Sequence, residues 1–175
     1  MQLQNQSFRM GQVCAVAGVS ANTLNAWINR EQLKIDNPNQ FGWRRFSFMD
    51  LLRVCAWAEV KGAGISPVDA PQVVYEVEGA LERFALEGVP ERCERDGFFV
   101  LAEVLAPVEM DGTTQHIVNV RLANWSRVCE ALRTPSAERL LDSATVVLVN
   151  PVKLFKRIEK TLASALFANL PSDEA

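Results

Sequence analysis

The sequence has few of the residues that build metal sites, disulfide frameworks and membrane spans. His116 is its single histidine, and its four cysteines are scattered without a C-x-x-C pair, so we expect neither a zinc site nor a disulfide framework. No apolar run approaches the roughly 18 residues of a membrane-spanning helix, and the first ten residues do not read as a secretion signal. We therefore expect a cytoplasmic protein without membrane attachment.

Signatures of enzymes are also missing. Neither a G-x-x-x-x-G-K nor a G-x-G-x-x-G phosphate-binding pattern occurs. A lone histidine in a strand pattern is more often structural than catalytic. Cys129, which could pair with it as a nucleophile, falls on the apolar face of an expected helix. The sequence thus predicts no enzymatic activity, no catalytic residues and no cofactor.

Charge is divided unevenly along the chain. The net charge of the 175 residues is −3. Residues 1–62 carry seven basic and four acidic side chains, a net of +3, whereas residues 63–175 carry eleven and seventeen, a net of −6. Such an asymmetry favours an anionic partner for the N-terminal part alone.

Two short amphipathic helices separated by a glycine turn open the chain. Apolar residues recur at helical spacing from Met10 to Ala17, and Gly18 can end this helix in a left-handed conformation. Ser20 can cap a second helix that runs through Arg30. Two helices joined by a turn of three or four residues with a glycine form a helix-turn-helix. The second helix would then be a recognition helix for the major groove of DNA.

Short polar side chains predominate on the outward face of this second helix. Asparagine can bind adenine through two hydrogen bonds, and a Thr or Ala methyl group can contact the methyl group of thymine. Taken alone, such residues would be ordinary solvated surface. The glycine turn before this helix and the wing segment that follows it favour contacts of these residues with DNA bases. The candidate DNA-contacting residues of this helix are Ser20, Asn22, Thr23, Asn25, Ala26, Asn29 and Arg30.

A short segment with β-strand character follows the second helix. Its residues Gly42–Ser47 (GWRRFS) predict a wing that contacts the DNA backbone or the minor groove. Arg44 and Arg45 are the candidate phosphate contacts, because the planar guanidinium fork holds two oxygens at once. Neighbouring strand residues point to opposite faces, so we expect one of them to face DNA and the other to pair with an acidic residue. Trp43 is a further candidate for stacking on the sugar–phosphate edge, whereas we assign Phe46 to the core.

Together these segments resemble the MerR-type winged helix-turn-helix regulators over about residues 8–88. That family runs from a helix through G-V-S into a recognition helix with an aromatic residue, then through a G-Y-R-x-Y-S wing and a helix that ends in G-F-S. The counterparts here are Gly18-Val19-Ser20, Trp27, the GWRRFS wing and Gly64-Ile65-Ser66. The resemblance implies a DNA-binding transcriptional regulator that acts on double-stranded DNA, and RNA polymerase or another regulatory protein is a further candidate partner. A single winged module offers few base contacts, so we expect a homodimer mediated by residues 67–175 and a monomeric fragment ending near residue 66.

The later part of the chain departs from that family, because neither a long dimerising coiled coil nor metal-binding cysteines are recognisable there. Excisionases and other phage-type proteins share the same small winged module. Two alternatives therefore stay open. One is a phage-type excisionase or packaging accessory DNA-binding protein, and the other is a protein-interaction adaptor that has lost DNA binding.

The pattern changes after residue 90. Two β-rich apolar runs flank Asp111-Gly112, a hairpin signal with a connection longer than two residues. A helix capped by Asn124, the buried-strand run ATVVLV and a helix starting at Asn150-Pro151 follow. The predicted fold class is α+β. It comprises a winged helix-turn-helix at 1–66, a linking amphipathic helix at 67–90 and a small α/β domain of order ββαβα at 91–170, for self-association or for binding a partner or ligand.

Two apolar helix stripes are candidates for the dimer contact, and either could instead cover the C-terminal sheet. The last helix also carries cations, which we expect to form an ordinary solvated face rather than a second DNA-facing patch. The stripes are Val73, Val77, Leu81 and Phe84, and Phe155, Ile158, Leu162 and Leu166; the cations are Lys153, Lys156, Arg157 and Lys160.

Overall fold

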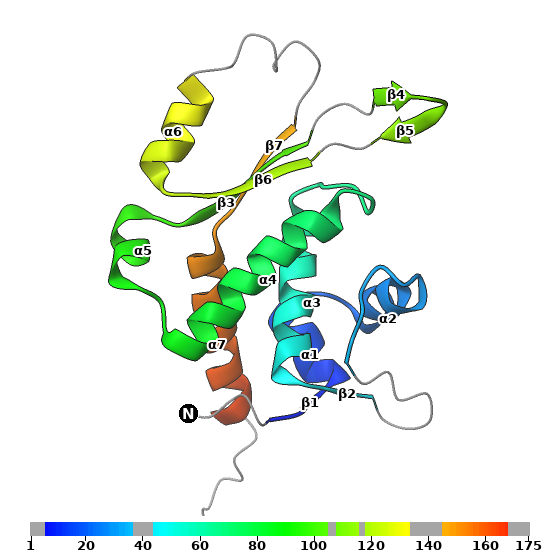
Figure 1. The fold of residues 1–175 in the computed structure, drawn as a ribbon. Coiled ribbons are helices and arrows are strands. Elements are labelled where there is room, and N and C mark those ends of the chain that lie inside the picture. The colour runs from blue at the N-terminus through cyan, green and yellow to red at the C-terminus, as the bar shows by residue number, and fades with distance from the viewer. Residues whose placement is uncertain (1–5, 37–43, 105–107, 116–117, 134–144, 168–175) are drawn as a thin grey trace, which may run out of the picture. The chain divides into compact units, whose positions relative to one another are not determined.

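A computed structural model of the chain describes residues 6–36, 44–104, 108–115, 118–133 and 145–167 (Figure 1). The chain divides into two compact units. We call residues 1–58 with 153–175 the N-terminal unit, and residues 59–152 the sheet unit. Helices come first and a sheet follows later in the chain, which confirms the α+β class.

The first two helices of the N-terminal unit form the predicted helix-turn-helix. Helix α1 spans Met10–Ala17 and α2 spans Ala21–Asn29. Gly18 lies between them with φ 70° and ψ 31°, a left-handed conformation that strains residues with a side chain. The Oγ of Ser20 accepts the backbone N–H of Thr23 at 3.1 Å and so caps α2. Both helix limits agree with the prediction to within one residue.

A two-stranded antiparallel ribbon accompanies these helices. Strand β1 (Phe8–Arg9) pairs with β2 (Arg45–Phe46), so that Phe8 lies opposite Phe46 and Arg9 lies opposite Arg45. Both phenylalanines are buried, whereas both arginines are exposed. One face of the ribbon therefore belongs to the core and the other carries positive charge.

Of the predicted wing, the structure describes residues 44–47. Gly42 and Trp43 lie outside the described residues, so the stacking role of Trp43 stays a prediction. Phe46 is fully buried, as the sequence analysis expects of a core residue.

Helix α3 (Phe48–Gly62) starts two residues before Asp50, and α7 (Pro151–Phe167) is the last helix. Residues 153–175, which include most of α7, belong to the N-terminal unit. Both helices bury an apolar stripe, and each large side chain removed from water stabilises the fold by about 1.5–3 kcal/mol. The buried residues are Leu51, Leu52, Val54, Cys55 and Trp57 of α3 and Leu154, Phe155, Ile158 and Leu162 of α7.

The sheet unit is built on a three-stranded antiparallel sheet with the strand order β6-β3-β7. Helix α4 packs on β3 and β6, and its predicted apolar stripe is buried. At the end of this stripe, Phe84 meets Phe98 edge-on at 5.8 Å between ring centroids. The bounds are Ala70–Glu87 for α4, Phe99–Val104 for β3, Val118–Ala123 for β6 and Thr145–Val149 for β7.

The hairpin at Asp111 and Gly112 is tighter than expected. These two residues have φ values of 51° and 74°, and they alone separate β4 (Val108–Met110) from β5 (Thr113–Gln115). Positive φ at both turn positions matches the twist of a two-residue hairpin. The predicted pair of long strands is thus four strands, because β3 and β6 join the sheet while β4 and β5 pair only with each other.

Strand β7 is not buried on both faces, as the run ATVVLV suggested. Val147 and Val149 are buried, but Val146 and Leu148 are 39% and 37% exposed. Alternate strand residues point to opposite faces, and the register places Val146 and Leu148 on the face that carries the exposed Arg121. The prediction was wrong here because this face is only partly covered: Leu101, the partner of Leu148 in β3, is buried, whereas Val146 and Leu148 are partly exposed.

Two short helices that flank the sheet complete the described elements. They are α5 (Glu91–Asp96), which the sequence analysis did not predict, and α6 (Trp125–Arg133). The domain limits at residues 66 and 90 stay predictions. Within the described ranges, no helix is both long and apolar enough to cross a membrane.

Candidate nucleic-acid interface

Helix α2 presents asparagines along one face and hydrophobic residues along the other. Asn22, Asn25 and Asn29 are spaced by three and four residues, so they share a face. Asn22 and Asn29 are exposed and Asn25 is half-buried, whereas Leu24 is fully buried. The outward face expected for base reading is therefore available over two turns of the helix, with the half-buried Ala26 beside it.

An aromatic contact attaches α2 to α3. The ring of Trp27 meets Trp57 edge-on, with 6.4 Å between centroids and 68° between planes. Such pairs favour an edge-to-face geometry and stabilise a contact by about 0.5–1.5 kcal/mol beyond their burial. The orientation of the recognition helix is thus fixed by a contact inside the N-terminal unit.

Two of the predicted DNA contacts have a structural role at the start of α2. The hydroxyl groups of Ser20 and Thr23 are 2.8 Å apart and share a hydrogen bond, in addition to the cap that Ser20 makes. At the other end, Arg30 is the exposed C-cap residue of α2. Ser20 and Thr23 therefore order the first turn, while Arg30 leaves a positive charge after the last turn.

A side-chain hydrogen bond connects the wing to the recognition helix. The Nη1 of Arg44 donates to the Oδ1 of Asn25 at 3.3 Å, in a part-buried position. One wing arginine was expected to pair with an acidic residue, but Arg44 bonds to a side-chain amide of α2. Arg45, the other wing arginine, is exposed. The two arginines thus divide their roles, with Arg44 turned to the helix and Arg45 to solvent.

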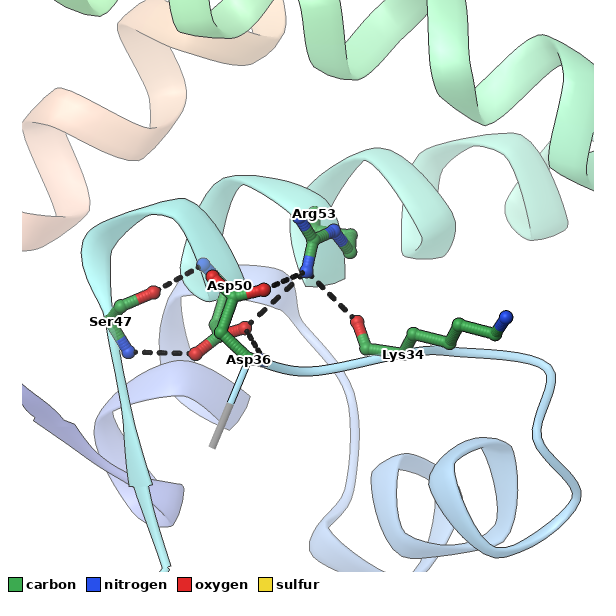
Figure 2. A network of polar contacts seen from close by, with 5 residues as sticks. All are labelled: Lys34, Asp36, Ser47, Asp50 and Arg53. Atoms are coloured by element: carbon green, nitrogen blue, oxygen red, sulfur yellow. Dashed lines mark hydrogen bonds and ion pairs between the residues drawn. The ribbon is translucent and has the colours of Figure 1, made fainter. Parts of the chain in front are cut away.

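The base of the wing is organised by Asp50, whose side chain is 1% exposed (Figure 2). Its Oδ2 accepts the backbone N–H of Ser47 at 2.9 Å, and the Oγ of Ser47 accepts the N–H of Asp50 at 3.0 Å. This reciprocal pair is a capping box, which satisfies two backbone donors at the start of α3. It explains why α3 begins at Phe48, directly after Ser47.

The carboxylate of Asp50 also binds the backbone at residue 36, on the N-terminal side of the wing. The Oδ1 of Asp50 accepts the backbone N–H of Asp36 at 2.9 Å. Arg53 extends the network, since its Nη1 lies 3.6 Å from Asp50 Oδ1 and donates to Asp36 Oδ1 at 3.1 Å and to the carbonyl oxygen of Lys34 at 3.0 Å (Figure 2). Residues 36 and 47, which bracket the wing, are thus fixed to one buried group.

This network was not predicted, although the sequence contains a signal for it. Ser47 and Asp50 stand in an S-x-x-D spacing before the apolar run of α3, and that spacing is the sequence signature of a capping box. The bond from Asp50 to residue 36 has no comparable local signal, because it joins positions fourteen residues apart.

The cysteines and acidic residues of the described ranges form no metal centre. No group of three or more His, Cys, Asp or Glu side chains there is placed to hold a metal ion. All four cysteines are free thiols, and burial raises the pKa of Cys14. A raised pKa keeps that thiol protonated at neutral pH, which lowers its reactivity as a nucleophile or ligand.

A helix-turn-helix with an exposed polar face on its second helix, hydrogen-bonded to Arg44 just before strand β2, is the arrangement of a winged helix-turn-helix domain. Residues 8–76 match the family model described as MerR HTH family regulatory protein. This segment therefore matches a MerR-type helix-turn-helix domain, which is a type of domain that DNA-binding transcription regulators carry. A search of curated proteins found no match to the chain. The predicted resemblance is confirmed for the N-terminal region and does not extend past residue 76.

Proposed function

We propose that the protein regulates transcription by binding a specific sequence of double-stranded DNA, without enzymatic activity, in the cytoplasm. Helix α2 enters the major groove and reads bases through its asparagine face. The wing strand with Arg44 and Arg45 contacts the backbone or the minor groove. RNA polymerase or another regulatory protein is the partner through which the bound protein acts.

The observation that carries this proposal is the bond between Arg44 and Asn25. It holds the recognition helix and the wing together in the free protein. Ordering of loops and side chains opposes binding by about 0.5–1.5 kcal/mol for each immobilised side chain. An interface that is ordered beforehand binds with a smaller entropic cost, which is the arrangement a specific binder needs.

Selection from a random pool of duplex DNA, followed by salt titration on the selected and an unrelated duplex, tests the function. We expect an enriched motif and an affinity that falls steeply with salt, with a slope of about −0.9 per phosphate contact in a log–log plot. Salt-dependent binding without enrichment would favour the excisionase or packaging reading. Affinity that does not depend on salt, or no binding, would favour the adaptor that has lost DNA binding.

We further propose that the protein binds as a homodimer, because paired modules on half-sites about 34–36 Å apart give a small reader enough contacts. The two apolar helix stripes that were expected to form the dimer contact are not exposed for it. The α4 stripe is buried and α4 packs on the sheet, and Phe155, Ile158 and Leu162 of α7 are buried within the chain as well. The side chain of Leu166 lies outside the described residues. Exposed apolar residues of the sheet unit remain as candidates: Val146 and Leu148 share one face of the sheet, and Leu122 lies on the other.

Sedimentation velocity of the full chain measures the oligomeric state. The full chain is needed because residues 153–175 belong to the N-terminal unit, so a fragment ending near residue 66 would lose part of the unit it is meant to isolate. We expect a dimer at tens of micromolar that dissociates on dilution. A monomer at every concentration would exclude this homodimer.

A further inference from the structure

Two arginines face each other on the exposed side of the β1–β2 ribbon. Arg9 and Arg45 are cross-strand partners, and both are exposed. Directly opposite residues have Cβ atoms about 4.5–5.5 Å apart, and like charges in such a pair destabilise the strands. In the part of the chain that the structure describes, neither guanidinium has an acidic side chain within ion-pair distance. The pair is unfavourable for the fold, so its positive charge is available to an anion from outside.

The amino end of α1 adds backbone donors beside this pair. Arg9 is the N-cap of α1, and its own N–H donates to the Oε1 of Gln12 at 2.8 Å. The following amides of Met10, Gly11 and Gln12 have no acceptor within the helix. The first turn carries no acidic residue, so no side-chain carboxylate of that turn takes the place that an anion favours at a helix N-terminus.

Gly11 keeps this helix end open. A Cβ atom added there would meet nothing within 4 Å, and Cβ atoms of a helix tilt toward its N-terminus. Glycine therefore leaves free the space that an anion needs to approach the amides of the first turn, although the surrounding fold would accept alanine.

We propose that Arg9, Arg45 and the α1 amides around Gly11 form one clamp for a phosphodiester of the DNA backbone. This inference rests on the proposed function, and it adds a phosphate contact outside the recognition helix and the turn of the wing. A phosphodiester has two unesterified oxygens, and the lone pairs of each can accept N–H groups from both guanidinium groups. Arg45 then shares its phosphate with a residue at the start of the chain.

Salt titrations of full-length variants on the selected duplex test the clamp. The variants are Arg9→Gln, Arg45→Gln and the double variant, with Arg92→Gln as a control that removes one exposed charge from α5 of the sheet unit. Because both arginines hold one phosphate, the slope of the double variant should fall in magnitude by about 1 and not by about 2. Arg92→Gln should keep the parent slope.

Gly11→Ala provides a variant that keeps every charge. It should fold at least as stably as the parent, because alanine is the better helix former and its Cβ meets open space. It should nevertheless weaken binding to DNA, since its Cβ occupies the anion position. Unchanged binding by Gly11→Ala would remove the helix amides from the clamp.

Different negative results distinguish a failure of the clamp from a failure of the proposed function. If the parent binds with a steep salt dependence and Arg9→Gln matches it in affinity and slope, the clamp is wrong and the proposed function stands. A slope change of about 2 in the double variant would assign the arginines to separate phosphates and overturn the shared clamp.

If the parent shows no salt-dependent binding, the proposed function fails and the clamp is judged by NMR of the parent. Inorganic phosphate is then compared with chloride at equal ionic strength. Shifts of the Arg9 and Arg45 Nε–H resonances, with those of Arg92 unchanged, would keep the anion site. Unchanged Arg9 and Arg45 resonances would overturn it.

Discussion

The two compact units of the chain carry opposite net charge. The N-terminal unit has ten basic and six acidic side chains, a net of +4, whereas the sheet unit has eight and fifteen, a net of −7. A positive surface attracts the phosphate backbone and a negative one is repelled by it. The acidic pI of 5.3 therefore reflects the excess of acidic residues in the sheet unit, although the N-terminal unit is basic. Charge is informative about DNA binding only when it is assigned to folded units.

The units also differ in how their charged side chains are used. The N-terminal unit buries a carboxylate, Asp50, which bonds to the backbone on both sides of the wing. In the described part of the sheet unit, ion pairs such as Arg95–Asp96 and Arg127–Glu130 lie at the surface. Exposed pairs contribute little to stability, whereas a buried acceptor fixes backbone geometry. The sheet unit also buries a carboxylate, Asp69, which accepts the hydroxyl group of Ser66 at 2.6 Å. Asp50 differs from it because it accepts backbone N–H groups on both sides of the wing.

Loss of the buried carboxylate should give the largest effect. We expect Asp50→Ala to lower the free energy of unfolding of the N-terminal unit by about 3 kcal/mol, because it leaves two part-buried backbone donors without this acceptor and removes a partner of Arg53. Urea denaturation followed by tryptophan fluorescence measures this change. DNA affinity should fall as well under conditions where the variant remains folded, because the stems of the wing are released.

Asp96→Ala is the matched control in the sheet unit. Asp96 lies at the surface, and the guanidinium of Arg95, which donates to it at 2.8 Å, holds the pKa of its carboxyl below the usual value. Solvent screens such a pair, so we expect no measurable shift of the unfolding midpoint. If Asp96→Ala destabilised the protein as much as Asp50→Ala, the contrast between the two units would be wrong.

Local patterns in the sequence were sufficient for the helix-turn-helix. Gly18, Ser20 and the spacing of apolar residues act within a few positions of one another, and the structure has the helices and the turn where these signals place them. The long amphipathic helix was predicted for the same reason, and it ends at Gly88 as expected. Short-range capping and periodicity are readable because each signal and its effect lie close together in the chain.

The geometry of the candidate DNA interface could not be predicted, because it depends on contacts between residues far apart in the sequence. Arg44 reaches Asn25 across nineteen positions, and Arg9 faces Arg45 only because β1 pairs with β2. Strand register and long-range side-chain contacts follow from the packing of the whole unit. Arg9 was accordingly absent from the predicted DNA contacts, while Asn25 and Arg44 were assigned separate roles.

A smaller effect, confined to particular base pairs, should follow from breaking the bond between Asn25 and Arg44. We expect Asn25→Ala to lose about 1–2 kcal/mol on the selected duplex and little on an unrelated one, because a base-edge contact is worth most on its preferred pair. Arg44→Ala should weaken binding to both duplexes and also reduce the preference at the base pair that Asn25 reads, since Arg44 orients the amide. Competition binding with substituted duplexes measures both preferences.

The double variant decides whether the wing and the recognition helix act as one element. If Arg44 orients Asn25, the combined loss should be smaller than the sum of the single losses by about 0.5 kcal/mol or more, as residues in contact show. Asn22→Ala is the matched control, because Asn22 lies on the same face of α2 and the structure records no bond from it to the wing in the described ranges. Its loss should add to that of Arg44→Ala. Strict additivity for Asn25 with Arg44 would mean that helix and wing bind DNA independently and that the bond seen in the free protein has no part in specificity.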